Sequence, residues 1–198
     1  MKYITYLFFI GFVVILILFL KNALQPKLEP VSITGADKCG ECHKLKINGN
    51  QDSIWENSKH SQAFKILISQ RAKDFTSKNN IVPPIENKLC LKCHTTVNHL
   101  QGTPVLSSYR VDEGVGCESC HGAGSNYSPA KIMTDSYQFR KNGGKNGDEN
   151  TCFECHSPKG NKEQLLKDDV CPFQTSDFIY KTEFDKIKHP VNKNNFTN

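Results

Sequence analysis

The pentapeptide C-x-x-C-H occurs four times in this 198-residue chain, and no other feature constrains the fold as strongly. The four copies use eight of the nine cysteines and four of the seven histidines. C-x-x-C-H is the attachment signature of c-type haem, in which both thiols bind the haem and the next histidine binds its iron. The attachment cysteines are Cys39, Cys42, Cys90, Cys93, Cys117, Cys120, Cys152 and Cys155, and the histidines are His43, His94, His121 and His156. We expect four covalently bound haem c groups, each with one iron.

Zinc ribbons and disulfides are the alternative uses of paired cysteines. A zinc ribbon does not need a histidine directly after every second cysteine, and adjacent residues do not easily bind the same ion. The pattern therefore favours haem over zinc or a disulfide framework.

The apolar content of the chain is modest for its length, at 37% including the N-terminal segment. A haem is a large and mostly apolar body that can replace aliphatic side chains at the centre of a fold. We predict a mainly α fold of short helices and loops wrapped around four covalent haems, with an N-terminal transmembrane helix. Within it we expect an amphipathic helix over residues 53–69, which carries His60, and a short strand over residues 106–111.

The N-terminal stretch Tyr3–Leu20 contains no charged residue. Its length is close to the roughly 20 residues of a membrane-spanning helix and exceeds the core of a cleavable signal peptide. We predict an uncleaved signal anchor over residues 1–22, a tether over 23–37 and a tetrahaem domain over 38–198. Because c-type haem is attached outside the cytoplasmic membrane, the expected localisation is that membrane, crossed once, with the haem domain in the periplasm.

Each motif histidine takes one axial position on its iron, so four further ligands would complete four six-coordinate haems. The chain offers three more histidines, His60, His99 and His189. At most three haems can therefore have two histidine ligands. Met133, Tyr127 and the ninth cysteine, Cys171, are other candidate ligands, although ordinary packing or surface roles are commoner for such residues.

The residues around the motifs resemble the cytochrome c-554 family of tetrahaem electron carriers. The resemblance covers most of residues 38–191 and lies in Trp55-x-x-Ser58-x-His60, in residues 90–96 (CLKCHTT), in 114–122 (GVGCESCHG) and in 184–190 (FDKIKHP). It implies that His60 and His189 are distal ligands. It also implies three bis-histidine haems and one five-coordinate haem, the latter at His94.

The chain departs from the family pattern after the third motif. Related proteins commonly continue as C-H-G-P-G-x-x-H, whose last histidine is a distal ligand, whereas Tyr127 stands at that position here. We therefore expect fully ligated haems at His43 and His156, and an open position at His94 or His121.

Electron transfer is the predicted function, because four haems in one small domain lie close to one another. The expected partners are redox proteins: a quinol dehydrogenase or soluble cytochrome as donor, and a periplasmic acceptor or reductase. The alternative is an enzyme that converts a small nitrogen compound or peroxide at an open haem, so enzymatic activity is left undecided; a haem sensor is the third reading. Scattered lysines without interleaved aromatics indicate no nucleic-acid partner.

Overall fold

The structure is a computed structural model that describes residues 11–17, 19–20, 30–156 and 178–190. The chain divides into two units, residues 1–30 and 31–198. The predicted boundaries of anchor, tether and haem domain remain predictions, and Cys171 lies outside the described residues.

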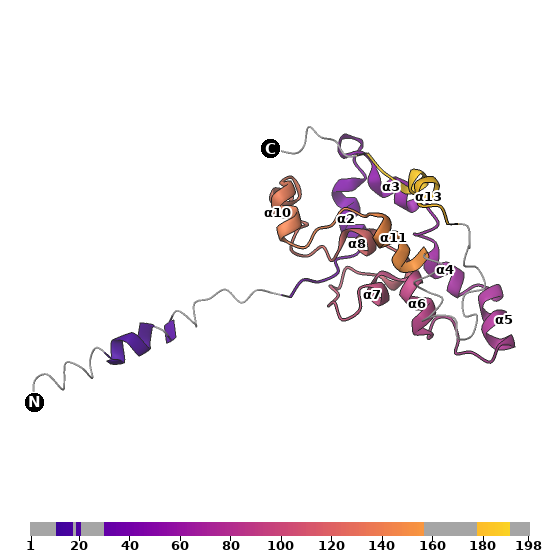
Figure 1. The fold of residues 1–198 in the computed structure, drawn as a ribbon, viewed down its shortest axis with the longest axis horizontal. Helices are drawn as coiled ribbons and strands as arrows, with labels where there is room; N and C mark the ends of the chain where they lie inside the picture. The colour runs from indigo at the N-terminus through magenta and orange to yellow at the C-terminus, as the bar shows by residue number, and fades with distance from the viewer. Residues whose placement is uncertain (1–10, 18, 21–29, 157–177, 191–198) are drawn as a thin grey trace, which may run out of the picture. The chain divides into compact units, whose positions relative to one another are not determined.

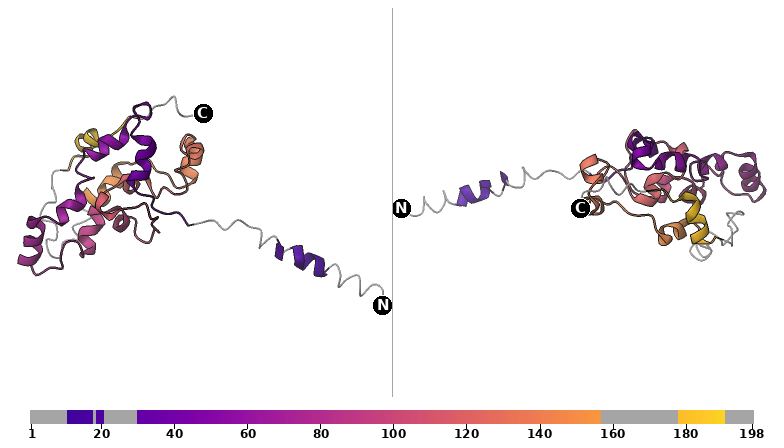
Figure 2. Two further views of the ribbon diagram at one scale, coloured as in Figure 1. Left: turned by 180° about the vertical axis from the view of Figure 1, so that it is seen from behind. Right: turned by 90° about the horizontal axis from the view of Figure 1, so that it is seen from above.

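Short helices joined by loops make up the second unit (Figures 1 and 2). In chain order they are α2 (Ala36–His43), η1 (Lys46–Asn48), α3 (Gln51–Glu56), α4 (Ala63–Leu67), α5 (Gln70–Lys78), α6 (Lys88–His94), α7 (Thr96–His99), η2 (Val111–Glu113), α8 (Cys117–His121), α9 (Ala130–Met133), α10 (Ser136–Lys141), α11 (Glu149–His156) and α13 (Tyr180–Ile187). The predicted mainly helical fold class is confirmed.

Each of the four pentapeptides lies in a helix. The helices α2, α6 and α8 end at the histidine of a motif, and the described residues of α11 run to His156. Residues three and four positions apart share one face of a helix, so one turn presents two thiols and an imidazole on the same side. The helices also lie together, with α2 beside α8, α8 beside α7 and α7 beside α6 (Figure 1).

The apolar core of the described chain is small. Only Ile33, Ala36, Ala63, Leu67 and Tyr127 are buried hydrophobic residues there, and the buried polar residues outnumber them. A domain of this size needs far more buried apolar surface to offset its conformational entropy. The core is consistent with a fold whose apolar centre is supplied by bound haem.

Glu118, inside the third motif, connects three segments through its buried carboxylate. It is 1% exposed and accepts hydrogen bonds from the backbone N–H groups of Thr34 and Gly35, each at 2.8 Å, and of Gly124 at 2.6 Å. The Thr34 hydroxyl donates a fourth at 3.1 Å. Segment 32–36, which leads into α2 and the first motif, is thereby fixed to α8 and the third motif.

A second buried carboxyl group, that of Glu113, lies next to this segment. Its Oε2 accepts a hydrogen bond from the backbone N–H of Ala36 at 3.0 Å, while its Oε1 is buried without a partner. Burial, together with the nearby charges of Glu118 and Asp37, raises the pKa of Glu113 to about 7. A neutral carboxyl group tolerates an unpaired buried oxygen better than a carboxylate does.

The helix predicted over residues 53–69 is interrupted. The structure has α3 before the break and α4 after it, and His60 lies in the turn between them. Serine side chains satisfy backbone groups at the break: Ser61 donates to the carbonyl of Glu56, and Ser58 accepts from the N–H of His60. Such bonds compete with continuation of a helix, so the prediction was wrong at this point.

The strand predicted over residues 106–111 is also wrong. The described residues contain only an isolated bridge between Ile33 and Val105, and η2 begins at Val111. After one bond from the N–H of Leu106 to Ile33, the chain turns back, with Tyr109 donating to the carbonyl of Leu106. Because of this turn, too few extended residues remain to form a second β-bridge.

The predicted membrane localisation is corrected. Among the described residues, no helix is long and apolar enough to cross a membrane. The helical residues described in the N-terminal segment are 11–17 and 19–20. The other residues of the predicted anchor, 1–10, 18 and 21–22, lie outside the described part of the chain.

Replacement of Glu118 tests its role in connecting the first and third motifs. We expect Glu118→Ala to lower the free energy of unfolding of the holoprotein by at least about 3 kcal/mol, because four donors lose a buried acceptor. The matched control is Glu41→Ala in the first motif, whose side chain is 60% exposed; it should change stability by less than about 0.5 kcal/mol. Guanidinium unfolding followed by circular dichroism measures both, and equal effects would contradict the assignment.

Glu113 also predicts a pH dependence of stability. Its pKa is 4.5 when unperturbed and about 7 in the folded protein, so between these values the folded state binds more protons than the unfolded state. The free energy of unfolding contributed by Glu113 therefore decreases as pH rises through this window, by at most about 1.4 kcal/mol per pH unit. The free energy of unfolding, plotted against pH from about pH 5 to about pH 8, should have a smaller slope for Glu113→Gln than for the unsubstituted protein. Identical slopes would refute this prediction.

Candidate haem-binding sites

Three of the four motif histidines have their Nδ1 atoms hydrogen-bonded to an oxygen. The bonds join His43 to Oε1 of Gln51 at 3.1 Å, His94 to the carbonyl of Ala63 at 2.7 Å and His121 to the carbonyl of Lys145 at 2.8 Å. Because these oxygens are acceptors, Nδ1 carries the proton and Nε2 is the nitrogen left for a metal. A hydrogen bond of this kind orients a ligating histidine and makes it a stronger donor.

Two pairs of histidine rings face each other. The ring centres are 5.9 Å apart for His60 and His156, and 5.7 Å apart for His121 and His189. Two imidazoles on opposite sides of one metal ion, with metal–nitrogen distances of about 2 Å, have ring centres about 6 Å apart. The spacing of both pairs therefore fits an iron between them.

These four histidines are held in the neutral form. Burial is the main cause that lowers the pKa of each of His60, His121, His156 and His189. A neutral imidazole is the form that binds a metal ion, so the environment suits ligation. The donor set, its protonation and its spacing all fit haem iron.

The other two motif histidines, His43 and His94, have no histidine ring facing them in the described residues, which include all seven histidines. The sequence predicted a fully ligated haem at His43, with His189 as one possible distal ligand. In the structure, the ring of His189 lies next to that of His121. His60 lies opposite His156, the arrangement expected of a fully ligated fourth-motif haem.

His99 lies beside the fourth motif rather than opposite a motif histidine. Its side chain is 7% exposed, with Nε2 3.3 Å from Oε2 of Glu154 and Nδ1 3.7 Å from Sγ of Cys155. The described contacts of His99 therefore differ from those of His60 and His189.

Of the other candidate ligands, Tyr127 is buried close to the first motif. Its hydroxyl donates to the carbonyl of Gly122 at 2.6 Å, and its ring packs edge-on against Phe139 at 4.9 Å. Burial, with the nearby Cys39 as the next cause, raises its pKa, so the side chain is a neutral phenol. Met133 ends α9.

Cysteines of different motifs contact one another. Cys39 lies beside Cys117, and Cys93 beside Cys155, so the first motif adjoins the third and the second adjoins the fourth. Burial, with the neighbouring Cys152 as the next cause, raises the pKa of Cys120 to about 11, so the third and fourth motifs also adjoin. The attachment sites thus follow the spatial order first, third, fourth, second.

The alternative uses of cysteine find no support in the described residues. All eight motif cysteines are free thiols. No group of three or more His, Cys, Asp or Glu side chains there could hold a metal ion in the way a zinc ribbon does.

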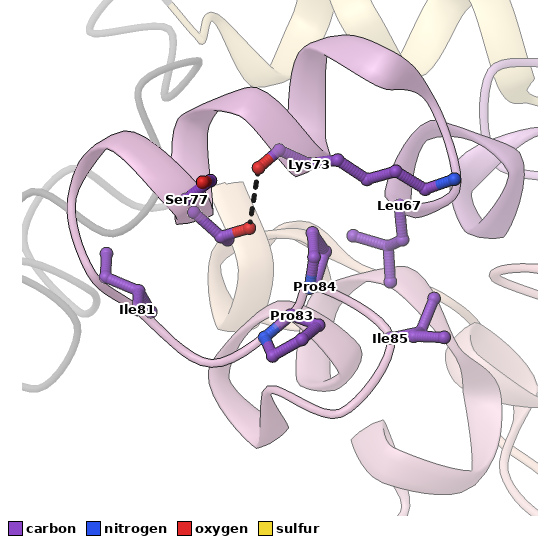
Figure 3. A pocket seen from close by; sticks show the side chains of 8 residues that line it. Leu67, Lys73, Ser77, Ile81, Pro83, Pro84 and Ile85 are labelled. Atoms are coloured by element: carbon purple, nitrogen blue, oxygen red, sulfur yellow. Dashed lines mark hydrogen bonds between the residues drawn. The ribbon is translucent and has the colours of Figure 1, made fainter.

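A surface pocket of about 420 Å³ lies between α4, α5 and the loop before α6 (Figure 3). Figure 3 shows Lys73 and Ser77 of α5 across from Pro83. The lining residues are Leu67, Lys73, Thr76, Ser77, Ile81, Pro83, Pro84 and Ile85. None of them belongs to a motif, so the pocket is separate from the attachment sites.

Sequence reasoning missed the groups that orient the motif histidines. Two of them are backbone carbonyls, which carry no sequence signal. The third, Gln51, follows His43 by eight residues, across η1, and nothing in its local pattern indicates a contact. Sequence reasoning missed Glu118 as well, because Glu41 and Glu154 stand in the first and fourth motifs and an acidic residue there does not mark a buried position.

Comparisons with known proteins agree with this arrangement. Residues 38–122 match the family model described as cytochrome c554 and c-prime. Cytochrome c-554 of Nitrosomonas europaea is 27% identical over 192 residues, which cover 88% of this chain and 79% of the relative. The solved structure of the reduced state of cytochrome c554 from the same organism aligns over 80% of this chain and 79% of that chain, with a TM-score of 0.51 and 22% identity, and shares the fold.

These matches confirm the predicted resemblance to the cytochrome c554 family. Residues 38–122 match the model of that family, whose members are multihaem electron-transfer cytochromes. The predicted cofactor, covalently bound haem c, is confirmed with it.

Gln51 offers a test of how a motif histidine is oriented. We expect Gln51→Leu to raise the midpoint potential of one haem by roughly 30–60 mV, because a histidine without its acceptor stabilises ferric iron less, and about 59 mV corresponds to a tenfold change. Spectroelectrochemical titration measures the shift. Gln62→Leu, whose side chain contacts only Ser61 and Lys65, is the control. Four unchanged potentials in Gln51→Leu would disprove the role.

Proposed function

We propose that this protein is a tetrahaem electron carrier of the cytochrome c554 family, with one haem at each motif. The observation that carries the proposal is the pairing of His60 with His156 and of His121 with His189, at spacings suited to an iron. The proposed attachment residues are the eight motif cysteines. The proposed iron ligands are His43, His94, His121 and His156, with His60 and His189 as distal ligands; the described contacts of His99 do not favour it as a third.

Bound haem c supplies reversible one-electron chemistry. The protein's part is to keep the ligand set the same in both oxidation states. The Nδ1 hydrogen bonds described above hold the imidazole rings in one orientation, and burial keeps the paired imidazoles neutral. A site that does not rearrange on reduction suits electron transfer rather than substrate turnover.

The order of the attachment sites supports a continuous route for electrons. Contacts between Cys39 and Cys117 and between Cys93 and Cys155 indicate that motifs distant in sequence hold adjacent groups. Electrons would enter near the first or the second motif, at the two ends of the series. The proposed donor is a quinol dehydrogenase or another cytochrome, and the proposed acceptor is a reductase or a further carrier.

An enzymatic function is the second candidate, favoured by one observation: no histidine ring faces His94 in the described residues. The resemblance to the family implies an open haem at this motif. Such a site would bind nitric oxide, hydroxylamine or peroxide while the paired sites supply electrons.

Paramagnetic resonance of ferric protein tests the proposed ligands. His60→Ala and His189→Ala should each convert one low-spin haem into a high-spin haem, because each removes one of two axial imidazoles. His99→Ala, also a buried histidine, should leave the low-spin count unchanged. A high-spin haem gained in His99→Ala, or none gained in the other two, would contradict the assignment.

A stopped-flow experiment separates carrier from enzyme. The reduced holoprotein should be oxidised completely by a small soluble cytochrome without any nitrogen compound or peroxide present. If oxidation requires such a compound, the carrier proposal fails and the enzymatic one stands.

A further inference from the structure

Four bis-histidine haems would need four distal histidines, whereas three histidines lie outside the motifs. His60 faces His156, and His99 contacts Glu154 and Cys155. His189 is therefore the one remaining histidine for both the first and the third motif. One imidazole binds one iron, so one of these two sites has no distal histidine.

The position of His189 decides between the two sites. Its ring centre is 5.7 Å from that of His121, and no such ring contact joins it to His43. Its C-terminal neighbour Pro190 accepts a hydrogen bond from Nε2 of Gln51 at 2.9 Å, and Oε1 of the same Gln51 accepts from His43. Gln51 thus connects the segment after His189 to the Nδ1 atom of His43, while the ring of His189 lies next to that of His121.

A buried phenol lies at the first motif. Tyr127 is 4% exposed and near Cys39, and its hydroxyl is already bonded to the carbonyl of Gly122. The loop that carries it is fixed to the segment before α2 directly, through the N–H of Ser125 donating to Ser32, and by way of Glu118, which accepts from the N–H groups of both Gly124 and Thr34. Tyr127 is therefore a neutral phenol whose hydroxyl already donates to Gly122, and it does not take the place of a distal histidine ligand.

Carboxylates dominate the charge around this site. The Glu118 carboxylate is buried beside Tyr127, and Asp52 lies near Cys117, the neighbour of Cys39. Lys44 is the nearby cation, and it lies next to His43. Such surroundings disfavour an anion such as nitrite and admit an uncharged ligand.

We propose that the first-motif site is open on the face opposite His43 and binds a small uncharged diatomic ligand, nitric oxide or carbon monoxide, beside Tyr127. The inference rests on the proposed tetrahaem function and adds a second open site to the one expected at His94.

Resonance Raman spectroscopy of the ferrous holoprotein tests the assignment. A haem with histidine as its one axial ligand gives an iron–histidine stretching band, whereas a bis-histidine haem does not. Gln51→Leu should shift one such band to lower frequency, because His43 loses its hydrogen-bond acceptor. Gln62→Leu should shift none. If no iron–histidine band responds to Gln51→Leu, the first-motif site is closed and the proposal is overturned.

Ligand counting provides the second measurement. Carbon monoxide should bind two of the four haems in the unsubstituted protein and in Tyr127→Phe, and one in Tyr127→His, where an imidazole replaces the phenol. Binding to one haem or none in the unsubstituted protein, or to two in Tyr127→His, overturns the proposal. The haem content of the same samples separates the two claims: fewer than four haems contradicts the proposed function, whereas four haems with one open site contradicts only this inference.

Discussion

The helical spacing of the pentapeptide is the constraint on which the rest of the structure depends. In one helical turn it brings two thiols and an imidazole to the same face, and each of the four copies lies in a helix whose described residues run to the motif histidine. The small aliphatic core follows from this, because a chain that packs around haem needs few apolar side chains of its own.

Polar groups take over part of the role that a hydrophobic core has in other domains. Glu118 joins the segment before the first motif to the third motif through three of its four hydrogen bonds, and backbone carbonyls fix the rings of His94 and His121. Hydrogen bonds are directional, whereas apolar contacts are not. They can therefore set the orientation of a ligand ring, which packing alone would leave less well defined.

Sequence patterns correctly predicted the features that depend on residues close together in the chain. The mainly helical class, the resemblance to the family and covalent haem as the cofactor were correct, because C-x-x-C-H carries its chemistry within five residues. The helix over 53–69 and the strand over 106–111 failed, because serine side chains and one turn override periodicity. The contact of His189 with His121 joins residues far apart in the chain, and no local signal reports it.

Anomalous diffraction at the iron edge, from crystals of the holoprotein, tests the central claim most directly. The account predicts four iron peaks: one between the rings of His60 and His156, one between those of His121 and His189, and one beside Nε2 of each of His43 and His94. Fewer than four peaks, or a peak between His43 and His189, would contradict it.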